Sequence, residues 1–203
     1  MSSIAKGECL MKQDRRVRRT RKALQAAYLR LCKLYQEHEI SVSMITDEAD
    51  INRATFYMHF TNKEDFIEEM LYDLLTGLED AIITAFQHHS TININKLTPT
   101  TEVIFQYIEE NMEALQALSK SHADFMKRFE QLFHHIFTER IYIETKSPKD
   151  NLNYDIFIHY QTKATLGLIQ YWINSNSKFS KEYMMDQLTL LSNTQITSLQ
   201  LKS

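Results

Sequence analysis

The 203-residue sequence contains little that would break a helix: only three glycines and two prolines. Its two cysteines, Cys9 and Cys32, lie far apart and predict neither a disulfide framework nor a metal cluster. No apolar run approaches the roughly 18 residues that a membrane-spanning helix needs, and the N-terminus has no signal-peptide core. Because apolar residues recur at spacings of three and four, we predict an all-α protein of the cytoplasm that does not enter the membrane.

Catalytic signatures are absent from the sequence as well. The chain has no nucleophile elbow, no phosphate-cradling glycine loop and no paired-carboxylate pattern. Two histidine pairs, His88-His89 and His134-His135, do not suggest a metal site, because adjacent side chains on a helix point about 100° apart. We therefore predict that the protein is not an enzyme and holds neither a cofactor nor a metal ion.

The stretch 41–63 predicts two short helices joined by a tight turn. Ser41 can cap the first helix and Asn52 the second. Phe56 and Phe60 lie four residues apart, so one face of the second helix turns toward the core. This pattern is typical of a helix-turn-helix, in which the second helix enters the major groove of DNA.

The outer face of the second helix supplies candidate DNA contacts. Arg53 and Thr55 suit base edges, because Arg bonds guanine in a bidentate way and Thr offers a hydroxyl and a methyl group. Tyr57 and His59 suit backbone phosphates, and Lys63 adds charge at the start of the next helix. The remaining predicted contacts are Ser41, Ser43, Asn52 and Ala54. The alternative is that the Ser41 and Asn52 side chains only cap their helices. For Tyr57, the alternative is that its side chain only packs.

Charge is divided unevenly along the chain. Residues 1–35 hold ten Lys and Arg against two acidic residues, although the whole chain has a net charge of −3. A basic run opens the first predicted helix: Arg15, Arg16, Arg18, Arg19, Arg21 and Lys22. Such runs are usually a solvated helix face. The motif that follows favours DNA contact instead, in particular through Arg18 and Arg19.

The same stretch resembles the TetR family of bacterial repressors. The residues that match the family pattern are Ser41-Val42, Ile45, Ala49, Thr55-Phe56-Tyr57, His59-Phe60 and Asn62-Lys63-Glu64. Asp50 replaces the family's turn glycine, and Asp is one of the few other residues that adopt a left-handed backbone. The resemblance implies a homodimer that binds double-stranded DNA at a palindromic operator. It also implies a repressor, rather than an activator, that a small-molecule effector releases.

Helical periodicity and polar breaks divide the chain into three predicted parts. These are a disordered tail over 1–14, a DNA-binding domain over 15–62 and a helical regulatory and dimerisation domain over 63–203. The first helix is expected over about 15–36, and translation is expected to start at either Met1 or Met11. The main loop is expected over 88–100 and a second break over 146–150.

Two kinds of site are expected in the third part. A ligand pocket, with ordinary core packing as its alternative, would be lined by Phe105, Tyr107, Met126, Phe129, Tyr160 and Trp172. The last two predicted helices, over about 153–174 and 180–201, suit a bundle formed with a second copy of the chain. Its contacts would be Phe157, Ala164, Leu168, Met184, Leu188 and Leu191.

The stretches 167–172 and 180–182 resemble the TetR subgroup that includes the activator of dihydroxyacetone kinase genes. That resemblance allows a rival interpretation. In it, the chain is a helical interaction protein or co-activator controlled by a protein partner, and the motif is kept only as a folding unit. The basic N-terminal charge argues against the rival.

Overall fold

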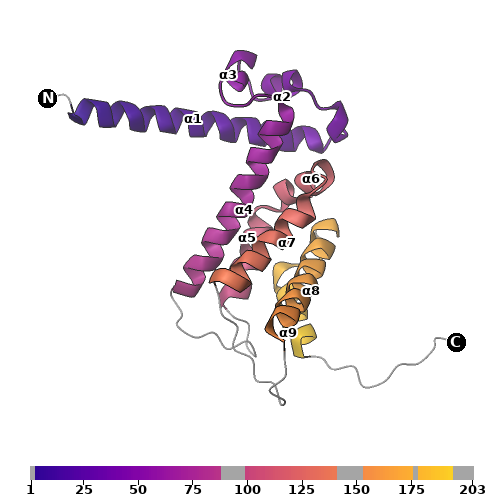
Figure 1. Ribbon diagram of the computed structural model, residues 1–203. Helices are drawn as coiled ribbons and strands as arrows, with labels where there is room; N and C mark the ends of the chain where they lie inside the picture. The colour runs from indigo at the N-terminus through magenta and orange to yellow at the C-terminus, as the bar shows by residue number, and fades with distance from the viewer. Residues whose placement is uncertain (1–2, 88–98, 141–152, 176–177, 194–203) are drawn as a thin grey trace. The chain divides into compact units, whose positions relative to one another are not determined.

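A computed structural model describes residues 3–87, 99–140, 153–175 and 178–193, and every regular element within these ranges is a helix (Figure 1). The chain divides into two compact units. The N-terminal unit comprises residues 1–72 and 120–123, and the C-terminal unit comprises residues 73–119 and 124–203. Among the described helices, none is both long and apolar enough to cross a membrane.

The N-terminal unit is formed by three helices and the start of a fourth. These are α1 (Ser3–Cys32), α2 (Val42–Glu48), α3 (Arg53–Tyr57) and the first turns of α4 (Lys63–Gln87), with a 3-10 turn at Glu37–Glu39. Helix α1 packs against α2, and α2 packs against α3 (Figure 1). The expected three-helix domain with its helix-turn-helix is therefore confirmed.

An aromatic cluster forms the centre of this unit. The ring of Phe66 lies 5.7 Å from that of Tyr28, 5.8 Å from that of Phe56 and 5.0 Å from that of Phe60. All four side chains are at most 4% exposed. Aromatic rings bury more apolar surface than other side chains, so this cluster dominates the packing of a small unit.

Two boundaries of the N-terminal unit differ from the sequence prediction. Helix α1 begins at Ser3 rather than near Arg15, so residues 3–14 are helical instead of a disordered tail. They include one glycine and no proline, and nothing in them stops the helix. The unit also extends to residue 72 rather than 62, because the first turns of α4 bury Phe66 and Met70.

Within the described ranges, the C-terminal unit contains the rest of α4 and five further α-helices. They are α5 (Pro99–Glu110), α6 (Met112–Ser121), α7 (Phe125–His135), α8 (Tyr154–Asn174) and α9 (Lys181–Asn193), and a π-helical turn, Ile136–Arg140, extends α7. Helix α7 packs against α8, α5 against α9, and α8 against α9. Phe125, Phe129 and Phe133 form the buried face of α7, as their spacing of four predicts.

The sequence predicts one helix from about residue 100 to 120, but the structure has two, α5 and α6. The break falls at Asn111, whose side-chain amide donates a hydrogen bond to the Tyr107 carbonyl at 2.8 Å. The Asn111 backbone amide also donates to that carbonyl, at 3.1 Å, so the helical hydrogen bond persists beside the side-chain one. The break expected over 146–150 lies outside the described residues, as does most of the loop expected over 88–100.

Candidate nucleic-acid interface

Local capping fixes where the two motif helices begin. The Ser41 hydroxyl accepts a hydrogen bond from the Met44 amide at 3.3 Å, and the Asn52 side chain accepts one from the Ala54 amide at 2.8 Å. Both capping predictions are confirmed. Between the helices, Asp50 has φ 52°, the left-handed conformation expected for a residue in place of the turn glycine.

Helix α3 presents a short polar face to solvent. Arg53 and Ala54 are exposed, Tyr57 is 47% exposed, and Thr55 is half-buried. Arg53 and Tyr57 contact each other: Arg53 Nη2 donates a hydrogen bond to the Tyr57 hydroxyl at 3.2 Å. Phe56 is the buried residue of α3, so its predicted inward orientation is confirmed.

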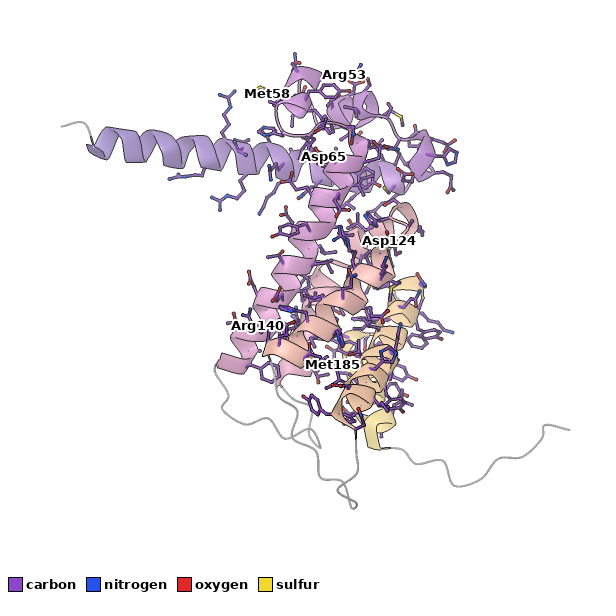
Figure 2. All side chains as sticks on the ribbon, in the orientation of Figure 1. Arg53, Met58, Asp65, Asp124, Arg140 and Met185 are labelled. Carbon is purple, nitrogen blue, oxygen red and sulfur yellow. The ribbon has the colours of Figure 1, made fainter. Side chains whose placement is uncertain are left out.

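Met58 also belongs to this surface, although it is not among the predicted contacts. It is 79% exposed and follows Tyr57 directly. Figure 2 shows Met58 and Arg53 at the same outer end of the N-terminal unit, beyond Asp65 at the start of α4. The signal was present in the sequence: if Phe56 and Phe60 face inward, the helical angle turns positions 57 and 58 outward.

Three other predicted contacts are more enclosed than Arg53, whereas Ser41 and Asn52 are exposed. Ser43 is half-buried, and its carbonyl accepts a hydrogen bond from the Thr46 hydroxyl at 3.0 Å. His59 is half-buried beside the Phe60 ring, at 6.2 Å between centroids. Lys63 is 14% exposed and is paired with Glu37 at 2.8 Å. Lys63 therefore has a partner inside the unit, unlike the exposed residues of α3.

Most of the basic run on α1 is open to solvent. The exposed members are Arg15, Arg16, Arg18, Arg19 and Lys22. Arg21 differs, because it forms an ion pair with Glu69 of α4 and its guanidinium lies 5.5 Å from the centre of the Phe60 ring. Arg18 and Arg19 therefore remain available as phosphate contacts, whereas Arg21 holds the unit together.

The end of α6 and the two residues that follow it also belong to the N-terminal unit. His122 Nε2 lies 2.8 Å from a carboxylate oxygen of Glu68 on α4. The Tyr28 hydroxyl of α1 is completely buried, and its pKa is raised, chiefly by that burial and against the effect of a Ser121 hydrogen bond. Residues 120–123 thus join α1 and α4 in one packed group.

The predicted pocket residues occupy different environments. Phe105, Phe129 and Trp172 are at most 2% exposed, and the rings of Phe105 and Trp172 lie 5.4 Å apart. Tyr107 and Met126 are half-buried. Tyr160 is 67% exposed on the outside of α8. It therefore lies outside the core that holds the other aromatic residues of the predicted set.

The predicted dimer contacts are divided in the same way. Ala164 and Leu191 are exposed, whereas Phe157, Leu168 and Leu188 are half-buried. Met184 is 1% exposed and packs inside its own chain. The exposed large apolar side chains of α8 and α9 are Ile156, Tyr160, Tyr171, Tyr183, Leu190 and Leu191, and among these Leu191 is a predicted contact.

Metal-ligating side chains do not gather within the described ranges, where no group of three or more His, Cys, Asp or Glu residues could hold an ion. Of the two histidine pairs, His88-His89 lies outside those ranges. His135 lies 3.3 Å from Glu139 and 3.8 Å from Glu79. Contacts of this kind between His and Glu side chains are ordinary on a charged helix surface.

Comparison with known proteins covers both units. Residues 37–70 match the model of bacterial regulatory proteins of the tetR family, and residues 95–194 match that of a transcriptional regulator C-terminal region. The chain belongs to the TetR family. The first match spans the whole helix-turn-helix, and the second spans α5 to α9.

Individual relatives agree with this assignment. YxbF of Bacillus subtilis (strain 168), an HTH-type transcriptional regulator, is 25% identical over 158 residues. The match covers 77% of this chain but 40% of that relative, so the chain spans less than half the relative's length.

Two solved structures share the fold. The dihydroxyacetone kinase operon activator DhaS has a TM-score of 0.62 at 20% identity, over 85% of this chain and 95% of that one. A TetR transcriptional regulator from Streptococcus agalactiae has a TM-score of 0.59 at 21% identity, over 90% and 98%. These likenesses establish the fold, and the subgroup resemblance of 167–172 stays a prediction.

Proposed function

We propose that this TetR-family protein binds a specific double-stranded DNA site in the cytoplasm and represses transcription from it. The observation that carries the proposal is the exposed face of α3, where Arg53 and Tyr57 are presented side by side at 3.2 Å. The exposed basic residues of α1 support it, because they supply positive charge in the same unit.

DNA selection tests this proposal. Purified protein would be mixed with genomic fragments, and bound fragments would be recovered and measured at two salt concentrations. The proposal expects one preferred class of fragment whose affinity falls with salt, since phosphate contacts release counterions. Arg53→Ala should weaken the preferred fragment about 5- to 150-fold, as expected for a base contact worth about 1–3 kcal/mol. Equal binding of all fragments by the native protein would contradict the proposal.

The active form is proposed to be a homodimer formed through the outer face of α8 and α9. Ile156, Tyr160 and Tyr171 recur along α8, and each is at least 56% exposed. Ile156 and Tyr160 are four residues apart and share one face of α8, and exposed apolar side chains that share a face suit an interface. Two copies related by a two-fold axis would also present two α3 helices to a palindromic operator.

Sedimentation tests the dimer. The native protein should sediment at twice the chain mass of 24.0 kDa, and Tyr160→Asp should shift it toward the monomer. Leu34→Asp is the control, because Leu34 is another large, exposed apolar residue, 75% exposed, in the N-terminal unit. A native monomer, or a Tyr160→Asp dimer as stable as the native one, would exclude this interface.

We propose that a small-molecule effector binds in the core of the C-terminal unit and thereby releases the protein from DNA. Thr162 on α8 is 2% exposed, and its hydroxyl has no hydrogen-bond partner among the described residues. A buried hydroxyl without a partner lowers stability, and a bound polar group would satisfy it. The aromatic side chains of the same core, Phe105 and Trp172, suit an effector that is otherwise apolar.

A thermal-shift screen of small apolar molecules with one polar group tests this part. A specific effector should raise the melting temperature of the native protein and weaken its DNA binding. Thr162→Val, which keeps the shape of the side chain and removes the hydroxyl, should reduce that shift. Control by a protein partner would instead leave every small molecule without effect.

A further inference from the structure

Arg53 and Tyr57 form a pair on the surface of α3. Arg53 Nη2 donates a hydrogen bond to the Tyr57 hydroxyl at 3.2 Å, and the guanidinium carbon lies 5.5 Å from the centre of the Tyr57 ring. The two residues are four apart and are the first and last residues of α3. Their contact is therefore the i,i+4 contact of a helix surface, combined with a cation–π interaction.

The Tyr57 ring is itself held by the core of the unit. It packs edge-on against Phe56 at 5.5 Å and 83°, and Phe56 is completely buried. Phe56 in turn lies 5.8 Å from Phe66 of α4. A ring fixed in this way limits the positions of the guanidinium stacked on it. Ordering Arg53 before DNA arrives reduces the rotamer entropy that binding would otherwise remove.

Hydrogen-bond capacity allows the pair to persist on DNA. A tyrosine hydroxyl accepts hydrogen bonds and donates one, so the Tyr57 hydroxyl that accepts from Arg53 still has its own proton for a phosphate oxygen. The guanidinium has five N–H donors and uses one of them on Tyr57. Enough donors remain for the bidentate contact with O6 and N7 of guanine.

We propose that Tyr57 is a positioning residue for Arg53, in addition to any phosphate contact of its own. The Tyr57 hydroxyl then links a backbone phosphate to the base that Arg53 reads, so Tyr57 sets how strongly guanine is preferred there. This inference rests on the proposed DNA-binding function. It makes Tyr57 a determinant of sequence specificity, although its hydroxyl need not touch a base.

A double-mutant cycle tests the inference. The native protein, Arg53→Ala, Tyr57→Phe and the double variant would each be measured on the preferred DNA site and on a scrambled site. Phenylalanine keeps the ring on Arg53 and on Phe56 and removes only the hydroxyl. Tyr35→Phe is the matched control, because Tyr35 is 45% exposed and lies outside the motif. The quantity compared is the ratio of the two dissociation constants.

In the presence of Arg53, Tyr57→Phe should reduce the ratio of scrambled to preferred dissociation constants about tenfold, a coupling of about 1.4 kcal/mol. In the Arg53→Ala background it should weaken both sites alike and leave the ratio unchanged. Tyr35→Phe should leave the ratio unchanged.

Two results would overturn the inference alone while leaving specific DNA binding intact. In the first, Tyr57→Phe weakens both sites equally even when Arg53 is present. In the second, it changes the ratio by the same factor with and without Arg53, so that the two effects simply multiply. If the native protein has no preferred site, the proposed function fails and the inference fails with it.

Discussion

Lys63 donates a hydrogen bond to the Glu37 carbonyl at 3.0 Å and forms an ion pair with the Glu37 carboxylate at 2.8 Å. The lysine side chain is only 14% exposed. We predict that Lys63→Met lowers the free energy of unfolding by about 1–3 kcal/mol, because the Glu37 carbonyl and carboxylate oxygens both lose a charged donor. Urea denaturation measures this. An unchanged urea midpoint, with a salt slope of DNA binding reduced by about one, would make Lys63 a phosphate contact instead.

Asp50 gives a second prediction, because it has φ 52° in the turn between α2 and α3. A left-handed backbone costs an ordinary L-residue roughly 1–2 kcal/mol, and glycine avoids most of that. Asp50→Ala should therefore lower the free energy of unfolding by about 1 kcal/mol, while Asp50→Gly should not lower it. Asp47→Ala is the control, since Asp47 is an exposed residue within α2. If Asp50→Ala and Asp50→Gly are equally stable, the turn is not strained.

Gly77 of α4 makes a close contact with Tyr107 of α5. A Cβ atom added at Gly77 would lie 2.5 Å from the Tyr107 hydroxyl, which a hydrogen bond to the Leu74 carbonyl holds at 2.8 Å. Helix propensity alone favours Ala over Gly by up to about 1 kcal/mol. We predict the opposite sign here, with Gly77→Ala destabilising by about 1–3 kcal/mol.

A suppressor separates the steric cause from other effects of Gly77→Ala. Removing the hydroxyl with Tyr107→Phe should lessen the loss caused by Gly77→Ala, as measured by chemical denaturation of the four proteins. Gly167→Ala on α8 is the control, because nothing lies within 4 Å of a Cβ there. Additive losses from Gly77→Ala and Tyr107→Phe would show that the hydroxyl is not the obstacle.

Alkaline pH should weaken the contribution of Tyr107 to the free energy of unfolding. Burial, and then the nearby carboxylates of Asp73, Asp80 and Glu110, raise the pKa of Tyr107 to about 12 from an unfolded value near 10. Because the folded pKa is the higher one, this stability is fully present below about pH 10 and is lost as pH rises toward 12. The difference in unfolding free energy between the native protein and Tyr107→Phe should shrink over that window. If that difference stayed constant over the same window, it would contradict the raised pKa of Tyr107.

Local sequence signals predicted the motif well, since caps and turns are set by residues within a few positions of each other. The hydrogen bonds of Ser41 and Asn52 and the left-handed Asp50 follow from residue type alone. The partner of Lys63 does not, because Glu37 lies 26 residues away in the chain. A charged side chain at a helix start looks the same in sequence whether it faces DNA or an internal carboxylate.

Helical periodicity had a different limit in the C-terminal unit. Spacing shows which residues share a face of a helix, but it does not show whether that face covers the chain's own core or a partner. Met184 was predicted as a dimer contact and lies in the core, whereas Tyr160 was predicted as a pocket residue and lies outside. Only the packing of α7 and α9 against α8 distinguishes the two faces.

Footprinting of the best selected genomic fragment tests the central claim most directly. A dimer that reads DNA through two α3 helices predicts protection with two-fold symmetry, in two half-sites whose centres lie about one helical turn of DNA, or a multiple of it, apart. Arg53→Ala should abolish that protection at protein concentrations where Tyr35→Phe retains it. Protection that is unsymmetric, or equal on unrelated fragments, would contradict a sequence-specific dimeric regulator.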